Sequence, residues 1–235
     1  MRNYFTFGGI DSRNYGVYIS GTGTYDAPVR AYEGYEVPGR DGALLGLEHR
    51  FENVELTYPA FVYDAFSNNM TNLRSALLSK IGYQELTDTY HPDEFRKAVY
   101  KGGLSADVVP GNYAGQFDLV FECMPQRWLR SGSTAVEMTS ASTLYNPTEF
   151  DSMPLIRVYG SGTIGINSMT VTIASHSNPY IDIDCEMMDC YYNTTNCNSL
   201  VSFSGNDFPT LRPGTNNFTL NGVTKIVVTP KWWRV

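Results

Sequence analysis

The chain has 235 residues, with 17 Lys and Arg against 24 Asp and Glu, so its formal net charge is −7. Only 17% of the residues are charged, where about 25% is usual, and this low, acidic charge disfavours a protein that clamps nucleic acid. The 17 Tyr, 12 Phe, 21 Gly and 12 Pro favour many short strands joined by turns over a helix bundle. We therefore expect a mostly β chain, all-β with one short helix, that forms two β-rich domains.

The sequence contains no run that could cross a membrane. No window approaches the roughly 18 uninterrupted apolar residues of a membrane-spanning helix, and the first residues lack the apolar stretch of a signal peptide. We therefore expect no membrane insertion and a protein made in a cytosol. The four cysteines are Cys123, Cys185, Cys190 and Cys197. In a cytosol they stay reduced, and their spacing indicates packing residues, not a zinc site.

Two turn motifs lie close together near residue 40. Pro38-Gly39 suits a type II turn, because glycine accepts the positive φ of its third position, and Asp41-Gly42 suits a type I′ hairpin. Glycine turns of this kind are natural protruding loops. The segment therefore predicts a hairpin tip at the surface.

One segment of the first half has helical spacing. Leu73, Leu77 and Ile81 recur every four residues, which predicts a helix over Asn68–Ile81. An asparagine at position 68 or 69 can cap its start, and Gly82 can end it. The flanking segments alternate as strands, which we expect over Glu55–Phe61 and Gly115–Cys123.

Charge is unevenly distributed along the chain. The first 132 residues include 28 charged ones, and the last 103 include 13. The change falls in a segment of small polar residues, 131–143, before a turn at Asn146-Pro147. We therefore predict an N-terminal domain over residues 1–132, a linker over 133–148 and a second domain over 149–235, whose last residues pack back on the first domain.

The second half has the pattern of a small antiparallel sandwich. Short runs of alternating β-branched residues are separated by glycine, proline and asparagine turns. We expect strands over Leu155–Tyr159, Met169–Ile173, Ile181–Cys185 and Thr224–Thr229.

A literal G-x-G-x-x-G motif occupies Gly160–Gly165, with Asp182 and Asp184 about 20 residues further on, as in a dinucleotide site. Such a site needs a helix whose N-terminus meets the pyrophosphate. Residues 166–173 instead alternate like a strand. The motif therefore predicts a glycine hairpin, and we expect no cofactor.

Three carboxylates should share one face of a strand, because Asp182, Asp184 and Glu186 alternate with apolar residues. A solvated sheet face is the favoured interpretation, with a calcium site and a glycosidase pair as alternatives. The three histidines are dispersed, and no nucleophile motif occurs. We therefore expect no metal and no catalytic residues, and we predict that the protein is not an enzyme.

Two adjacent tryptophans, Trp232 and Trp233, lie near the C-terminus. They could stack on sugars or bases as a ligand-binding pair, or they could close a core. The strand expected just before them leads into the pair, so we expect at least one ring to pack inside.

Eight segments, spread over nearly the whole chain, form a recognisable series: Phe7–Tyr18 (FGGIDSRNYGVY), Glu36–Leu44 (EVPGRDGAL), Leu73–Leu78 (LRSALL), Phe117–Trp128 (FDLVFECMPQRW), Pro154–Gly162 (PLIRVYGSG), Ile181–Glu186 (IDIDCE), Phe208–Asn216 (FPTLRPGTN) and Pro230–Trp232 (PKW). By their order and spacing they resemble the distal tail protein (Dit) family of siphovirus-like bacteriophages, whose long tails are non-contractile.

The resemblance implies a structural virion protein. In that family the N-terminal domains form a hexameric ring at the end of the tail tube, and galectin-like or carbohydrate-module-like C-terminal sandwiches project outward. The implied partners are further copies of the chain, the tail tube protein, the tail-associated tip protein and, in some phages, receptor-binding proteins, while DNA only passes through the channel. The implied location is the virion tail tip, assembled in the bacterial host cytoplasm.

Arg40 and Asp41, at the expected hairpin tip, are candidates for subunit contacts, because they could pair with a neighbouring copy. The alternative is an isolated tip in solvent. A second candidate function, from a different class, is a carbohydrate-binding module that recognises host cell-surface sugars. An exposed row of aromatic side chains on one sheet of the second domain would favour it, because the fold alone does not confer sugar binding.

Overall fold

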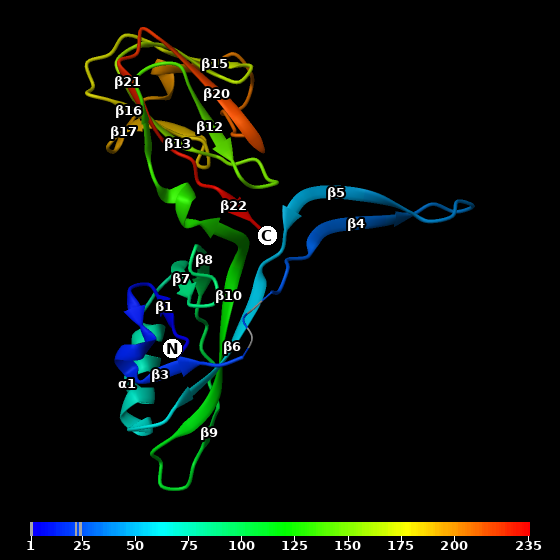
Figure 1. Cartoon of the computed structure of the whole chain (residues 1–235). Helices are drawn as coiled ribbons and strands as arrows, with labels where there is room; N and C mark the ends of the chain where they lie inside the picture. Colours follow the sequence, from blue (N-terminus) through cyan, green and yellow to red (C-terminus); the bar gives the residue numbers. More distant parts are fainter. Residues whose placement is uncertain (1, 22, 24) are drawn as a thin grey trace. The chain divides into compact units, whose positions relative to one another are not determined.

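The computed structural model describes residues 2–21, 23 and 25–235. Among them, strands account for 49% and helical residues for 10%, with one α-helix, which confirms the predicted all-β class. The chain divides into two compact units, Met1–Arg127 together with Val235, and Trp128–Arg234 (Figure 1). Each unit has its own hydrophobic core.

The first unit is built on one β-sheet. Its strands lie in the order β2, β1, β7, β8, β10, β6, β3, and β9 also pairs with β10. The longest of them, β10, contains the boundary between the units, and its first nine residues pair with β6, from Gly115 opposite Val62 to Cys123 opposite Val54. The bounds are β1 (Phe5–Phe7), β2 (Ile10–Asp11), β3 (Val17–Ile19), β6 (Val54–Val62), β7 (Gln84–Asp88), β8 (Glu94–Val99), β9 (Ala106–Val108) and β10 (Gly115–Leu129), with a 3-10 turn, η1, at Ser12–Tyr15.

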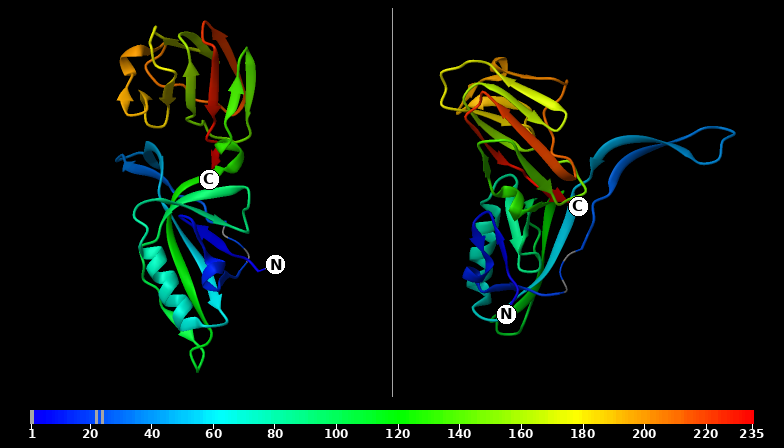
Figure 2. Two further views of the ribbon diagram at one scale, coloured as in Figure 1. Left: turned by 90° about the vertical axis from the view of Figure 1, so that its left-hand side faces the viewer. Right: turned by 45° about the horizontal axis from the view of Figure 1, so that its top comes forward.

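The helix α1 (Phe66–Leu78) lies against one face of this sheet (Figure 2). Its buried side chains form one stripe with helical spacing: Phe66, Met70, Leu73 and Leu77. The helix is confirmed, but it starts and ends earlier than predicted, because Phe66 extends the stripe backward while Ile81 is 90% exposed. Asn68 therefore lies within the helix, and Gly82 lies beyond its end.

Aromatic rings fill the core of the first unit around Phe121 of β10. The centroid of this ring lies 5.7 Å from that of Phe5, 5.1 Å from Phe7, 6.0 Å from Tyr58 and 5.4 Å from Tyr100. Phe121 is fully buried, and inclined ring pairs of this kind add about 0.5–1.5 kcal/mol each to the free energy of burial. The cluster therefore holds β1, β6 and β10 together.

Two further strands, β4 (Arg30–Glu36) and β5 (Ala43–Phe51), pair only with each other. This ribbon, residues 30–51, is called the arm below, and it extends beyond the first sheet (Figures 1 and 2). At its tip Gly39 has a φ of +81°, as the predicted type II turn requires. The predicted type I′ turn at Asp41-Gly42 is wrong, because Gly42 has a positive φ but Asp41 does not.

The second unit is a sandwich of two antiparallel sheets, in the orders β11-β21-β13-β16-β17-β18 and β12-β20-β14-β15-β19. Both sheets send alternate apolar side chains into one core, for example Ile156 and Ile183 from the first and Ile164 and Phe218 from the second. The bounds are β11 (Val136–Met138), β12 (Ser142–Asn146), β13 (Leu155–Tyr159), β14 (Gly162–Ile166), β15 (Met169–Ile173), β16 (Ile181–Asp184), β17 (Asp189–Tyr192), β18 (Thr195–Asn196), β19 (Val201–Phe203), β20 (Gly214–Asn221) and β21 (Lys225–Thr229), followed by β22 (Trp233–Arg234), with 3-10 turns η2 (Arg130–Ser133) and η3 (Asn198–Leu200).

Residues 133–148, expected as a linker, are part of this sandwich. They contain β11 and β12, which pair with β21 and β20. Asn146 is 1% exposed, and its amide donates to the carbonyl oxygens of Phe150 (2.9 Å) and Leu211 (3.0 Å). Small polar residues suggested a linker here, but they are equally suited to strands at the edges of two sheets, where one side faces solvent.

The glycine motif at Gly160–Gly165 forms a hairpin, as predicted. β14 pairs with β15 from Gly162 opposite Ile173 to Ile166 opposite Met169. Gly162 has a φ of +145°, and a Cβ there would lie 2.3 Å from the carbonyl oxygen of Asn221. The glycine therefore allows a close approach of two backbones.

Candidate functional site

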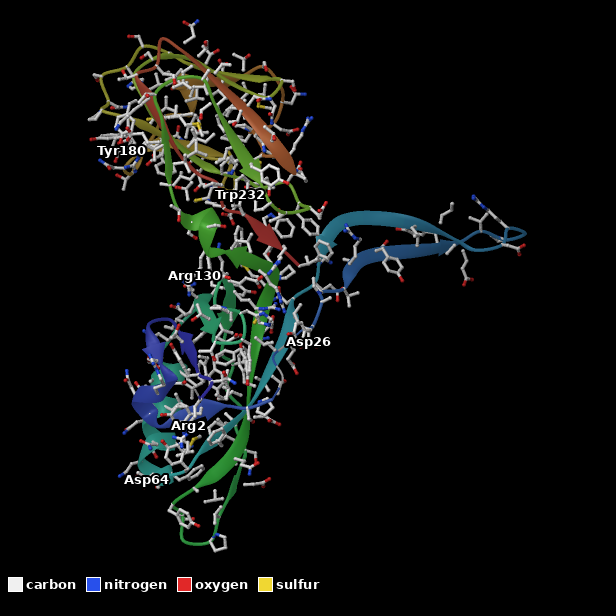
Figure 3. All side chains as sticks on the ribbon, viewed as in Figure 1. Arg2, Asp26, Asp64, Arg130, Tyr180 and Trp232 are labelled. Atoms are coloured by element: carbon white, nitrogen blue, oxygen red, sulfur yellow. The ribbon has the colours of Figure 1, made fainter. Side chains whose placement is uncertain are left out.

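The arm exposes apolar side chains on both of its faces. Tyr35 and Leu44 are cross-strand partners on one face and are 55% and 45% exposed, while Tyr32 and Leu45 lie on the other face and are 60% and 61% exposed. Figure 3 shows side chains standing out from both sides of the ribbon. A two-stranded ribbon alone is at best marginally stable in water, and exposed apolar patches mark interaction sites. The arm is therefore the strongest candidate for a docking element.

Exposed apolar surface is concentrated in the first unit. Besides the arm, the tip of the β9–β10 hairpin exposes Val108, Val109 and Tyr113. In the described part of the second unit, the exposed large apolar side chains are Tyr145, Met153, Met187 and Met188. The first unit therefore carries more of the surface that protein interfaces use.

Arg40 and Asp41, the predicted contact residues, lie at the tip of the arm and are exposed. A hydrogen bond closes the turn there: the backbone N–H of Arg40 donates to the carbonyl oxygen of Val37 (3.1 Å). Within the described residues, neither charged side chain has a hydrogen-bond or ion-pair partner. Both groups are therefore free to meet a partner from outside the chain.

The face of the first sheet opposite α1, called the outer face below, is acidic. Glu55 of β6 lies directly opposite Glu122 of β10, a like-charged pair that is unfavourable in an isolated sheet. Glu122 forms an ion pair with Lys101, which lowers the pKa of Glu122, and it accepts a hydrogen bond from Asn53 (2.8 Å). Asp118 is exposed on the same face of β10.

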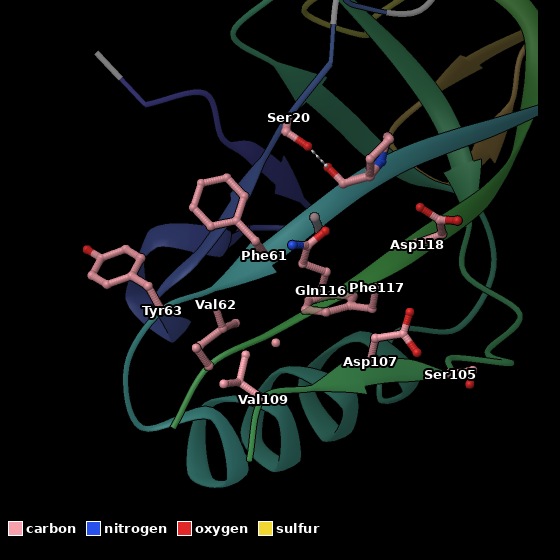
Figure 4. Close-up of a pocket in the computed structure, with 14 residues that line it drawn as sticks. Ser20, Phe61, Val62, Tyr63, Ser105, Asp107, Val109, Gln116, Phe117 and Asp118 are labelled. Atoms are coloured by element: carbon pink, nitrogen blue, oxygen red, sulfur yellow. Dashed lines mark hydrogen bonds between the residues drawn. The ribbon is translucent and has the colours of Figure 1, made fainter. Parts of the chain in front are cut away.

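A hollow of about 750 Å³ lies over β6, β9 and β10 (Figure 4). Its wall combines Pro59, Phe61 and Val109 with two carboxylates, Asp107 and Asp118. Histidine, cysteine and basic residues are missing from its described lining. A catalytic site needs groups with complementary roles that meet at one point. We therefore assign no reaction to the hollow, whose surface is partly apolar.

Of the three carboxylates expected on a solvated face of the second unit, Glu186 is exposed, but Asp182 and Asp184 are buried instead. Asp182 is 4% exposed and accepts two hydrogen bonds from Arg157, at 2.7 Å from Nε and 2.9 Å from Nη2. Asp184 is 6% exposed and accepts from Lys231 Nζ (3.2 Å), which also donates to Glu186 (2.9 Å). Burial opposes the charge of Lys231, but the two carboxylates raise its pKa overall. Asp182 and Asp184 are therefore paired with partly exposed cations, and no group of three or more metal-ligating side chains forms around them among the described residues.

Three tyrosines of the second unit form a continuous cluster. The ring of Tyr180 lies 5.9 Å from Tyr159 at 52° and 5.0 Å from Tyr192 at 71°, and all three are half-buried. Arg157 lies over the Tyr180 ring (4.0 Å), and Lys225 lies over the Tyr159 ring (4.8 Å). Sugars stack on flat, open aromatic faces, whereas these three rings are inclined to one another and cations cover two of them, Tyr159 and Tyr180. The geometry therefore gives carbohydrate binding no support.

The two tryptophans have different environments. Trp232 is 4% exposed and lies in the core of the second unit, so a ligand cannot stack on it. Trp233 is partly exposed; its ring stacks on Phe150 (4.4 Å), and its Nε1 donates to the carbonyl oxygen of Asp151 (3.0 Å). Trp232 therefore packs in the core, which confirms the expectation that at least one of the two rings packs inside.

Gly132 allows Trp232 to dock, and we expect Gly132→Ala to destabilise the second unit by about 1–3 kcal/mol, as overpacking does. A Cβ at this position would lie 2.2 Å from the Trp232 backbone nitrogen. Urea unfolding, followed by tryptophan fluorescence, measures the loss. Gly205→Ala is the matched control, because its Cβ would make only an ordinary contact of 3.6 Å with Met169. Equal stabilities of the two variants would contradict this account.

The four cysteines lie in the cores of the two units. All four cysteines are free and buried, and burial raises the pKa of the Cys123 and Cys190 thiols to about 12, so these thiols are packing residues. In the described part of the chain, no group of three or more histidine, cysteine or acidic residues could hold a metal ion. Its helices include none that is long and apolar enough to span a bilayer.

Neither a protein-family model nor a curated protein matches the sequence. The structure, in contrast, matches solved phage proteins. The SPP1 Dit (gp 19.1) protein, described as a paradigm of the hub adsorption apparatus in Gram-positive infecting phages, matches with a TM-score of 0.76 and 14% identity over 100% of both chains. A chain of the phage P2 baseplate in its activated conformation with Ca matches with a TM-score of 0.50 and 8% identity, over 97% of this chain and 98% of that one. The corresponding structure with Sr gives 0.50 and 9%, over 99% and 98%. Over its whole length, the chain therefore has the fold of a phage distal tail protein.

Proposed function

We propose that the protein is a structural component of a phage tail tip, a distal tail protein whose first units form a hexameric hub. The hub joins the tail tube to the tip and the host-adsorption apparatus. The observation that carries this proposal is the match in fold to SPP1 Dit over 100% of both chains. We assign the protein no enzymatic activity.

The arm supports the ring. A closed ring needs a heterologous contact, in which one patch of each subunit meets a different patch of the next. The arm supplies a protruding apolar patch, because Tyr32, Tyr35, Leu44 and Leu45 are exposed in the single chain. Docking on a neighbouring copy would bury them and would stabilise the ribbon itself.

The further partners follow from the same role. The ring would contact the tail tube protein on one side and the tail-associated tip protein on the other, with receptor-binding proteins attached at the periphery in some phages. The protein would reside at the virion tail tip after assembly in the cytoplasm of the bacterial host.

Charge supports a channel through which DNA passes without being held. Six copies with a charge of −7 give a ring of −42. The outer face carries part of this charge in Glu55 and Asp118, whereas the charge of Glu122 is balanced by Lys101. A channel lined by such a face would repel the phosphate backbone. An assembled ring whose channel is lined mainly by arginine and lysine would contradict this proposal.

The oligomeric state tests the ring directly. Native mass spectrometry of the purified chain should show a species of six times 26.3 kDa, and electron microscopy should show it as a ring with a central channel. A chain that stays monomeric at high concentration and also fails to bind purified tail tubes would contradict the proposed function.

Arg40→Glu tests the tip of the arm. If Arg40 pairs with a neighbouring copy, reversing its charge should weaken ring formation about tenfold or more, as the loss of an interfacial charge contact does. The concentration at which the ring dissociates measures the effect. Arg212→Glu, the same charge change at an exposed position of the second unit, is the control. Unchanged assembly of Arg40→Glu would mean that the tip makes no subunit contact.

A further inference from the structure

Two of the four cysteines face each other across a pair of antiparallel strands in the second unit. β17 and β18 pair with Tyr191 opposite Asn196. One step along the same register, Cys190 lies opposite Cys197, and the backbone N–H of Cys197 donates to the carbonyl oxygen of Cys190 (2.7 Å). The two cysteines are therefore cross-strand partners.

Both cysteine side chains point to the same side of this hairpin. Cys190 is 1% exposed, Cys197 is 2% exposed, and both belong to the core of the sandwich. The next residues of the two strands, Tyr191 and Asn196, are half-buried and exposed, as the alternation of a strand requires. The two sulfur atoms therefore lie side by side on the inner face of the sheet.

The backbone separation of such a pair suits a disulfide. The hydrogen bond between the two residues marks a hydrogen-bonded position, where opposite Cα atoms are about 5.5 Å apart. Disulfides join cysteines whose Cα atoms are about 4.4–6.8 Å apart. The sulfur of Cys197 has only long contacts, 3.5 Å to the carbonyl oxygen of Thr195 and 3.6 Å to the amide nitrogen of Asn178. Because sulfur is a weak donor and a weak acceptor, these contacts do not hold it away from Cys190.

The other two cysteines are excluded as partners of Cys190. Cys190 faces Ile183 of β16, so Cys185, two residues further along, is its diagonal neighbour. Diagonal neighbours are about 7–8 Å apart, beyond the limit of about 7 Å between the Cα atoms of a disulfide. Cys123 belongs to the separate core of the first unit. The register therefore selects one pair, Cys190 and Cys197.

We propose that Cys190 and Cys197 form an intrachain disulfide when the protein meets dioxygen outside a reducing cytosol. Each thiol loses one proton and one electron, and the two sulfur atoms form one bond. Dioxygen takes up both protons and both electrons and becomes hydrogen peroxide. The change of setting rests on the proposed function, because a virion leaves the reducing cytoplasm in which it was assembled. The reaction itself needs only the chain and the oxidant.

The disulfide would hold the edge of the sandwich together. β18 is the outermost strand of its sheet, and both of its residues are exposed, so local opening is easiest there. Such opening admits the oxidant, since burial raises the pKa of the Cys190 thiol to about 12 and makes the thiol unreactive in the closed hairpin. The bond would close the loop 191–196 and so reduce the conformational freedom of the unfolded chain.

Peptide mapping of the full chain tests the pairing. The purified protein is kept in air-saturated buffer with a catalytic copper complex, which speeds oxidation by dioxygen. Free thiols are then blocked in denaturant, and the chain is cut with chymotrypsin without reduction. Chymotrypsin cuts after Tyr191 and Tyr192, between the two cysteines, so the disulfide should keep the fragments on either side joined until a reductant is added. Four free thiols after prolonged oxidation would overturn the proposal, and so would a disulfide that includes either of the other cysteines.

Thermal unfolding measures what the bond does. Oxidation should raise the melting temperature of the second unit and increase its ratio of folded to unfolded chains about tenfold or more. Cys197→Ala should lose both this gain and the joined fragments. Cys185→Ala, which removes another buried thiol of the same core, should keep both. An equal gain on oxidation in Cys197→Ala and in the wild type would overturn the proposal.

The fragment maps of the wild type and of Cys185→Ala decide the question alone if Cys197→Ala does not fold. None of these measurements requires a ring. A failure of the disulfide would therefore leave the proposed function untouched, and a chain that forms no ring could still form the disulfide.

Discussion

Replacing the apolar residues of the arm is expected to abolish ring formation and to leave the chain folded. We choose two double variants, Tyr35→Thr with Leu44→Thr on one face, and Tyr32→Thr with Leu45→Thr on the other. Threonine keeps the β propensity of each position. All four side chains are 45% or more exposed in the single chain, so their loss removes no core contact.

The size of the effect follows from the surface that docking would bury. Fully burying an exposed side chain of this kind stabilises a complex by about 1.5–3 kcal/mol, and docking would gain about half of that here, because the four side chains are 45–61% exposed. The loss of two side chains should therefore weaken each subunit contact about tenfold or more. Because six contacts close one ring, native mass spectrometry should then show monomers at concentrations where the wild type is hexameric.

A matched control separates the arm from exposed apolar surface in general. Ile81→Thr removes a side chain that is 90% exposed but lies beyond the end of α1, and it should leave the ring intact. If only one of the two double variants dissociates, the arm docks through that face. Rings as tight as the wild type in both double variants would show that the arm is not the subunit contact.

The fold class and most of the elements could be predicted from local patterns. β13 and β15 have the predicted bounds, Leu155–Tyr159 and Met169–Ile173, because period-2 alternation directly reflects burial on one face of a strand. The end of α1 was predicted too late, since the spacing of Ile81 fits the helical stripe but its side chain is exposed. Spacing shows which residues can share a face and does not show whether that face is covered.

The same limit explains the candidate sites. The alternation of Asp182 and Asp184 predicted a shared face, but Arg157 and Lys231, which cover it, come from distant parts of the chain. For the arm, the turn residues near position 40 predicted the protruding tip. Tyr32, Tyr35, Leu44 and Leu45 were missed, because apolar residues in a strand normally indicate a core. Their exposure on both faces emerges only once β4 and β5 are seen to pair with no other strand.

Phe121→Ala is expected to unfold the first unit selectively. The ring is fully buried and lies within 6.0 Å of four other aromatic rings. Truncating a buried phenylalanine to alanine costs about 3–5 kcal/mol, because the cavity left behind collapses only in part. This is a large share of the stability of a domain of this size, for which about 5–15 kcal/mol is usual. The first unit should therefore unfold at much lower denaturant concentration.

Phe218→Ala is the matched variant in the second unit. Phe218 is 1% exposed and lies in the core of the sandwich, which shares no residue with the core around Phe121. If the two units are separate domains, each variant shifts a different unfolding transition and leaves the other in place. Calorimetry of the wild type and of both variants measures this. A single transition that both substitutions shift equally would mean that the chain unfolds as one cooperative body, and that the two cores stabilise each other although they share no residue.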